Sequence, residues 1–134
     1  MTAFPLKIVT PDGLLYDGQA EELIVRTVSG DMGILAGHID CVAPLGMGRA
    51  TVLAEGKKRY GACIGGMVSV VNGHVTLVPT TFEWAEDIDL QRANAAADRA
   101  KKIIGDKGAS DADIRMAQAR LKRALVRSSV AKPM

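Results

Sequence analysis

EDIDLQRANAAADRAKK, residues 86–102, marks the point at which the character of the chain changes. Before this stretch the sequence is rich in valine, glycine and threonine, and after it alanine and arginine dominate. All the aromatic residues precede it: Phe4, Tyr16, Tyr60, Phe82 and Trp84. Apolar side chains then recur with a helical period instead of a strand period. The change predicts a β-rich domain at residues 1–85 and a helical domain at residues 86–134.

The second domain has the pattern of two amphipathic helices. Asp87 and Asp89 are suited to cap or begin the first helix. Its apolar stripe is spaced at i, i+3, i+4, i+7 and i+11: Ala93, Ala96, Ala97, Ala100 and Ile104. The glycines of GDKGAS, residues 105–110, break this helix, and Ser110 with Asp113 resembles a capping box. A second stripe follows: Ile114, Ala117, Leu121, Ala124 and Leu125. The short loop between the stripes predicts an antiparallel helical hairpin.

Alanine faces allow two helices to approach closely but bury little apolar surface. Each buried methylene-sized group contributes roughly 0.8 kcal/mol, and isolated helices shorter than ~15 residues are marginal in water. We therefore expect this hairpin to lie close to balance between a docked and an open state. A weakly docked element of this kind is suited to moving.

The first domain has the pattern of short strands joined by tight turns. Its clearest piece is MVSVVNGHVTLVP, residues 67–79, because Asn72-Gly73 favours a type I′ hairpin turn. A two-residue loop there predicts three cross-strand pairs: Val70 with Val75, Ser69 with Thr76, and Val68 with Leu77. The four aliphatic side chains then share one face, which we expect to be buried.

Other strand candidates are FPLKIVT, EELIVRTV, GILA, DCVAPL, RATVLA and KRYGACI, with EGKK as a second hairpin turn. Seven or more short strands within residues 1–85 favour a small β-sandwich or barrel. The spacing leaves no room for helical crossovers. The fold class predicted from the residues is β + α, a sandwich followed by a helical hairpin.

The net charge of +2 is unevenly distributed. Residues 1–85 hold six Lys and Arg against eight Asp and Glu, whereas residues 86–134 hold eleven against seven. The first part is therefore −2 and the second +4, and a basic segment favours an anionic partner. Arg92 and Arg99 share one face of the first helix. A comparable line follows on the second: Met116, Arg120, Arg123 and Arg127.

The arginine spacing leaves two interpretations open. The side chains form two solvated basic faces, in which each charge contributes little, or they gather around one anion when the hairpin closes. A nucleic acid is disfavoured as the partner because the basic segment lacks the aromatic side chains on which bases stack.

The sequence holds no recognisable catalytic or metal-binding pattern. A G-x-S-x-G elbow and a Walker A loop are both missing, and His38 and His74 lie far apart without a ligand cluster. The longest apolar stretch, ACIGGMVSVV, is too short for direct membrane insertion, and no secretory signal is evident. Cys41 and Cys63 are expected to be reduced thiols in a cytosolic protein.

Four motifs occur in an order and spacing that resemble the epsilon subunit of bacterial rotary (F-type) ATP synthase. They are VTPDGLLYDG at residues 9–18, SGDMGILAGH at 29–38, GG…V…NGHVTLV at 65–78 and AEDIDLQRA at 85–93. The last is the most specific, since it is similar to the I/L-D-x-x-R-A signature of that family. Its positions here are Ile88, Asp89, Arg92 and Ala93.

The resemblance implies a ten-stranded β-sandwich and a two-helix domain in a non-catalytic subunit that requires no cofactor. The sandwich would contact the gamma subunit and the membrane-embedded c-ring, at the cytoplasmic face of the bacterial cell membrane. The folded hairpin would permit ATP hydrolysis. The extended hairpin would reach the catalytic alpha and beta subunits and inhibit it. Candidate interface residues lie in SGDMGILAGH, which by itself shows only a glycine-rich exposed turn: Asp31, Met32 and His38.

Some members of the family bind ATP as a regulatory ligand. The positions that match their contacts are Glu83, Ile88, Asp89, Arg92, Ala93, Arg99, Arg123 and Arg127. Arginine suits phosphate because its guanidinium is planar and always charged. Two positions depart from the family pattern, since Met116 replaces a frequent basic residue and GHID lacks the usual proline. The alternatives are a free-standing ATP-sensing module with the same fold and a small hydrolase with an unrecognised site.

Overall fold

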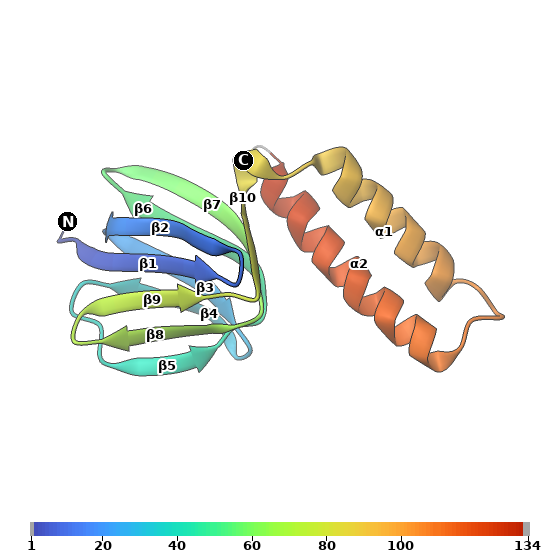
Figure 1. Cartoon of the computed structure of the whole chain (residues 1–134), viewed down its shortest axis with the longest axis horizontal. Coiled ribbons are helices and arrows are strands. Elements are labelled where there is room, and N and C mark those ends of the chain that lie inside the picture. The colour runs from blue at the N-terminus through green and yellow to red at the C-terminus, as the bar shows by residue number, and fades with distance from the viewer. Residues whose placement is uncertain (1, 133–134) are drawn as a thin grey trace. The chain divides into compact units, whose positions relative to one another are not determined.

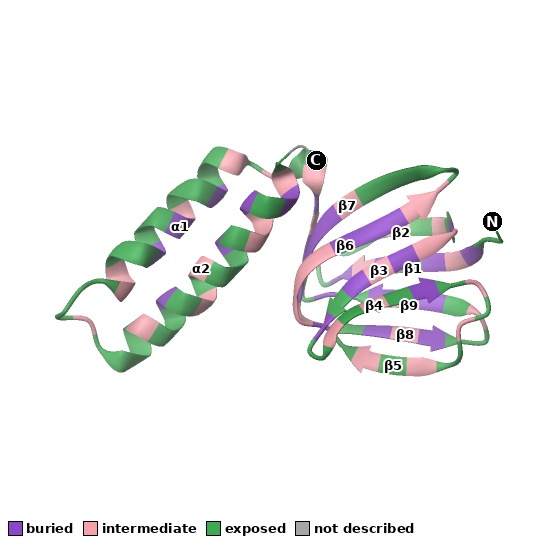
Figure 2. Ribbon diagram, turned by 180° about the vertical axis from the view of Figure 1, so that it is seen from behind, coloured by how far each residue is buried: buried purple, intermediate pink, exposed green. Residues whose placement is uncertain are grey.

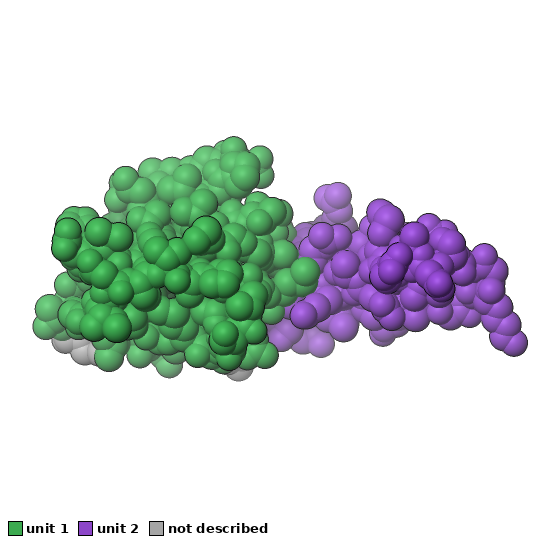
Figure 3. Space-filling view, turned by 90° about the horizontal axis from the view of Figure 1, so that it is seen from below, with its two compact units in different colours: residues 1–84 green, residues 85–134 purple. Residues whose placement is uncertain are grey.

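The computed structural model describes residues 2–132. The chain divides into two compact units, residues 1–84 and residues 85–134, which Figure 3 shows in different colours. Ten strands form the first unit and the helices form the second (Figure 1), as the fold class predicted. None of the described helices is long and apolar enough to cross a membrane.

The first unit is a sandwich of two five-stranded sheets. The first sheet contains, in spatial order, β2 (Gly13–Ala20), β1 (Phe4–Thr10), β9 (His74–Val78), β8 (Met67–Val71) and β5 (Cys41–Pro44). The second contains β10 (Thr81–Trp84), β7 (Lys57–Ile64), β6 (Met47–Ala54), β3 (Glu22–Thr27) and β4 (Gly30–Leu35). Neighbouring strands are antiparallel except β1 and β9, which are parallel. Side chains that alternate along the strands fill the space between the sheets.

The core draws on both sheets, and Figure 2 shows the buried residues along the strands. Its fully buried large side chains include Leu6, Ile8, Leu23, Val25, Ile34, Val52, Val68, Val70 and Leu77. Every second residue of β1 is buried, which is the period expected of a strand with one face on the core. All described members of this core cluster lie in the first unit.

The β8–β9 hairpin has the predicted register. Val70 pairs with Val75, Ser69 with Thr76 and Val68 with Leu77. The four aliphatic side chains are buried, whereas Ser69 and Thr76 are partly exposed. Asn72 and Gly73 have φ of 50° and 80°, as a type I′ turn requires. The second predicted hairpin turn, EGKK at residues 55–58, is also confirmed.

Two strands were missing from the candidates that the residue patterns supplied. Only Ala20 is buried in β2, so this strand lacks an alternating apolar face. β10 has only four residues and directly precedes the helical unit. The strand predicted for GILA is confirmed and is longer than predicted, so the glycine-rich exposed turn expected at residues 29–38 is present only in part. Most of that segment is β4, an edge strand paired with β3, and turns flank it at residues 28–29 and 36–37.

The second unit contains a short 3₁₀ turn, η1 (Ala85–Asp87), and two helices, α1 (Leu90–Ile104) and α2 (Asp111–Ala131). The side chain of Asp89 caps α1 by accepting from the Arg92 amide at 3.0 Å. Ser110 caps α2 by accepting from the Asp113 amide at 3.1 Å. Gly105 ends α1. Each cap satisfies an amide that has no partner inside the helix.

A seam of small buried residues joins the two helices. It consists of Ala93, Ala97 and Ala100 on α1 and Ala117, Ala124 and Ser128 on α2. The prediction that Leu125 extends this stripe was wrong, because its side chain is 49% exposed. Leu125 is one residue, about 100° of helix rotation, beyond Ala124. The next seam position is therefore Ser128.

Candidate functional site

The arginines predicted to bind ATP lie on one side of the helix pair. Each directly precedes a seam residue: Arg92–Ala93, Arg99–Ala100, Arg123–Ala124 and Arg127–Ser128. The helices are right-handed and antiparallel, so positions just before the seam lie on the same side of both. Met116 and Arg120 continue this row on α2, since they precede Ala117 and Leu121. We call this surface the arginine side.

The opposite side of the pair is a shallow groove. Positions that follow the seam line it, and its volume is about 530 Å³. Its lining residues are Asn94, Ala97, Asp98, Lys101, Leu125, Ser128, Ser129 and Lys132. None of the predicted ATP contacts lies in this groove. The two sides of the hairpin therefore differ in chemistry.

An interhelical hydrogen bond indicates how the arginines align along the helix axes. The Ser128 hydroxyl donates to the Asn94 side-chain oxygen at 3.0 Å, across 34 residues of sequence. Positions 94 and 128 therefore lie at the same level. Counting in opposite directions from that pair places Arg123 at the level of Arg99, and Arg127 between Arg92 and Arg99. The four guanidinium groups thus arise within about two helical turns, roughly 10 Å.

The I-D-x-x-R-A signature has a local structural basis. Asp89 is the N-cap of α1, and Ala93 is a fully buried seam residue. Arg92 has its amide bound to the cap and its side chain exposed on the arginine side. Ile88 is half-buried just before the cap. The motif therefore fixes the start of α1, its docking on α2 and one cation.

Glu83, the remaining predicted ATP contact, lies in the first unit, the sandwich. It is a half-buried residue of β10, opposite Ala62 of β7. The structure thus brings Arg92, Arg99, Arg123 and Arg127 to one side of the helix pair, and places Glu83 on the sandwich. Arg127 is half-buried, whereas the other three are exposed.

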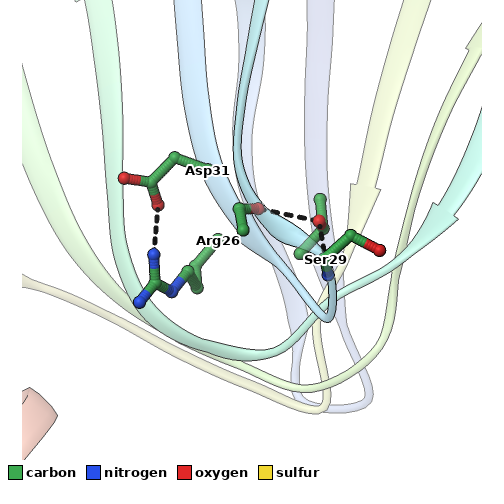
Figure 4. A network of polar contacts seen from close by, with 5 residues as sticks. Arg26, Ser29 and Asp31 are labelled. Carbon is green, nitrogen blue, oxygen red and sulfur yellow. Dashed lines mark hydrogen bonds and ion pairs between the residues drawn. The ribbon is translucent and has the colours of Figure 1, made fainter.

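The candidate interface residues are spread along β4 and the segment after it. Asp31 forms an exposed ion pair with Arg26 of β3 at 3.3 Å (Figure 4). The adjacent turn is held by Thr27, whose hydroxyl donates to the Gly30 carbonyl at 2.7 Å. Met32 packs partly against the sandwich core. His38 follows β4, with Nδ1 at 2.8 Å from the Ile39 carbonyl oxygen.

Both cysteines are free thiols, as predicted. Burial raises the pKa of the Cys63 thiol to about 12, so this group stays protonated at neutral pH. Cys41 is half-buried, with its sulfur 3.9 Å from Nδ1 of His38. Within residues 2–132, His, Cys, Asp and Glu side chains form no group of three that could hold a metal ion.

Sequence reasoning missed Asn94 and Ser128 as structural partners. The available signal was the seam period, because a position four residues after Ala124 is the next to face α1. That period marks Ser128 as a position facing α1, whereas its pairing with Asn94 is seen only in the structure.

A ten-stranded sandwich followed by an alanine-seamed, arginine-bearing helix pair defines a two-domain architecture known from ATP synthase. The β-sandwich domain of the ATP synthase delta/epsilon chain matches residues 3–85, and the long α-helix domain of that chain matches residues 86–132. The chain belongs to this family, as an epsilon chain. It is thereby a non-catalytic subunit of the ATP synthase complex.

Relatives match over nearly the full chain. The ATP synthase epsilon chain of Shouchella clausii is 39% identical over 98% of this chain and 97% of its own length. That of Bacillus velezensis is 43% identical over 98% of each. Among solved structures, a chain of the Euglena gracilis mitochondrial ATP synthase shares the fold with a TM-score of 0.86 and 24% identity, covering 98% of this chain and 83% of its own.

Proposed function

We propose that this epsilon chain sits in the central stalk of a bacterial ATP synthase and regulates ATP hydrolysis through its helical hairpin. The closed hairpin binds ATP on its arginine side without hydrolysing it and leaves the enzyme free to hydrolyse ATP. The open hairpin extends along the gamma subunit towards the catalytic alpha and beta subunits and inhibits hydrolysis. The sandwich holds the chain on gamma and on the c-ring, at the cytoplasmic face of the membrane.

The alignment of four arginines on one side of the pair carries the nucleotide part of this proposal. Arg92 and Arg99 come from α1, and Arg123 and Arg127 come from α2. Positive charges gathered on one side of the pair favour an anion between them. A triphosphate chain supplies several negative oxygens that accept from guanidinium groups on both helices. It favours the closed pair because only there do both sets of arginines reach it.

The thin seam makes such a ligand effective. A ligand shifts an equilibrium only by the difference in its affinity for the two states. At a hundredfold excess over its dissociation constant, ATP would stabilise the closed state by about 2.7 kcal/mol. The five seam alanines contribute roughly 0.8 kcal/mol for each buried methyl. The two contributions are of comparable size, so ATP concentration can control the hairpin.

The sandwich offers a surface suited to holding the chain in the stalk. On the outer face of the first sheet, Val42, Met67 and Val78 are 59%, 48% and 46% exposed. Together with Gly66, Ser69 and Thr76 they line a depression of about 450 Å³. Contiguous exposed apolar side chains of this kind mark protein-binding surfaces. They support gamma as a partner, and the β4 edge with Asp31 remains the candidate contact with the c-ring.

Calorimetry on the isolated full-length chain tests ATP binding. We expect the wild type to bind ATP, and Arg92→Ala or Arg123→Ala to weaken binding by roughly 1.5–3 kcal/mol, as for loss of a charge-assisted hydrogen bond. Arg115→Ala is the matched control, because Arg115 is exposed on α2 but lies away from both the seam and the arginine side. The ATP site is rejected if the wild type binds no ATP at millimolar concentration, or if all three variants keep its affinity.

A further inference from the structure

We propose that the Asn94–Ser128 hydrogen bond is a register pin, which sets the axial alignment of α1 and α2 and thereby positions the arginines for a common anion. This inference rests on the proposed ATP site for its consequence. The hydrogen bond itself belongs to the helix pair and does not depend on ATP. Asn94 and Ser128 are positioning residues in this scheme, because neither lies on the arginine side.

The alanines of the seam define its surface but not its register. Ala93, Ala97 and Ala100 on α1 face Ala117 and Ala124 on α2. A shift of one helix along the other by one turn, about 5.4 Å, again places the alanines against small side chains, while the half-buried Ile104 and Leu121 near the loop change partners. Packing of the alanines therefore discriminates weakly between alignments. A single buried polar residue is a known means of fixing register between apolar helices.

Ser128 meets the requirements of such a residue. It is a buried polar side chain, 6% exposed, and its hydroxyl is 3.0 Å from the Asn94 oxygen. In an alignment shifted by one turn, Ser128 loses Asn94 and lies at the level of Leu90 or of Asp98, depending on the direction of the shift. At the level of Leu90 its hydroxyl depends on a bond to a carbonyl in the preceding turn of its own helix, and at the level of Asp98 it meets a charged acceptor. The bond to the neutral Asn94 amide is made in the native alignment alone.

The Asn94–Ser128 hydrogen bond lies at the same height along the helix axes as the arginines. Positions 94 and 128 are within about one turn of Arg92 and Arg127, near the start of α1 and the end of α2. A shift by one turn that brings Ser128 to the level of Asp98 moves Arg123 to the level of residue 103 and Arg127 to that of Arg99. The four arginine positions then span about 16 Å along the helices instead of roughly 10 Å. Alignment and anion affinity are therefore coupled through this bond.

The first arm of the test measures register without ATP. Methyl–methyl nuclear Overhauser contacts between the seam alanines of α1 and α2 are recorded on the full-length chain. We expect Ser128→Ala and Asn94→Leu to add contacts of the alignment shifted by one turn. Asn94→Asp keeps an acceptor oxygen and should retain the single native set. Ser129→Ala is the matched control, since this neighbouring serine is exposed at the groove and is not one of the buried seam residues.

The second arm measures ATP affinity of the same variants. We expect Ser128→Ala and Asn94→Leu to bind ATP about two- to tenfold more weakly, the effect of one net hydrogen bond, with Asn94→Asp and Ser129→Ala close to the wild type. Unchanged alanine contacts in both Ser128→Ala and Asn94→Leu would overturn the pin. A changed register in a chain that binds no ATP even as wild type would uphold the pin and remove the proposed ATP site.

Discussion

Gly61 on β7 shows how one missing side chain shapes the sandwich. It pairs with Trp84 of β10, and the ring of Phe82 lies over it. A Cβ at residue 61 would come within 2.7 Å of the Phe82 Cε1 atom. The ring cannot retreat freely, because it packs edge-on against Trp84 with centroids 4.9 Å apart. The absence of a side chain at this position therefore allows the aromatic cluster to form.

Gly61→Ala should lower the free energy of unfolding by roughly 1–3 kcal/mol, the usual cost of overpacking a core. Urea denaturation followed by Trp84 fluorescence measures it, since this is the only tryptophan. The control is Gly33→Ala on β4, where an added Cβ meets nothing within 4 Å. That variant should stay within about 0.5 kcal/mol of the wild type. Equal stabilities for both variants would show that the ring moves aside without cost.

Substitution of Asp31 can distinguish a contact with the c-ring from a role in the stability of the sandwich. Its ion pair with Arg26 is exposed on both sides, so breaking it should change stability by less than about 1 kcal/mol. We expect Asp31→Ala to weaken proton-pumping coupling in assembled membranes while thermal unfolding stays unchanged. Arg26→Ala removes the same ion pair and should affect coupling less. Equal loss in the two variants would assign the effect to the ion pair, and no loss in either would reject the β4 edge as a contact.

At the scale of elements, the cap of α1 determines where the helical unit begins. Asp89→Ala should destabilise the first turn of α1 by about 1 kcal/mol, whereas Asp89→Asn should nearly preserve it, since both side chains accept from the Arg92 amide. Hydrogen exchange of that amide in ATP-free protein is the measurement. Asp87→Ala is the control, because Asp87 ends the preceding 3₁₀ turn. Protection of the Arg92 amide that survives Asp89→Ala would contradict the capping role.

The sequence predicted those elements in which local signals agree. Asn72-Gly73 and flanking alternation specify the β8–β9 register, and the Asp89 and Ser110 caps specify both helix starts. β2 was not predicted, because most of its side chains are exposed and show no apolar alternation. Its pairing with β1 holds it in the sheet. Leu125 is apolar but lies about 100° of helix rotation beyond Ala124, so its helical phase leaves it exposed.

The candidate site was predictable only in part. The arginine spacing placed Arg92 and Arg99 on one helix face, but their alignment with Arg123 and Arg127 depends on how α1 and α2 are registered. That register involves Asn94 and Ser128, which are polar and carry no periodic apolar signal. Nothing in the sequence alone shows which residue of one helix faces which residue of the other.

At the scale of the whole molecule, the unequal cores of the two units predict unequal stability. All the aromatic residues and the described core cluster lie within residues 1–84. Each large core side chain contributes about 1.5–3 kcal/mol, whereas a seam alanine contributes roughly 0.8. A chain ending at Glu86 should therefore unfold in one cooperative thermal transition, with a midpoint close to that of the sandwich in the full-length chain. Circular dichroism of this fragment is compared with that of residues 85–134. The second fragment should show only partial helix content in water, since the alanine seam between its helices of 15 and 21 residues buries little apolar surface. An unfolded sandwich fragment would mean that the two units depend on each other for stability, and the hairpin could not then open while the rest of the chain stays folded.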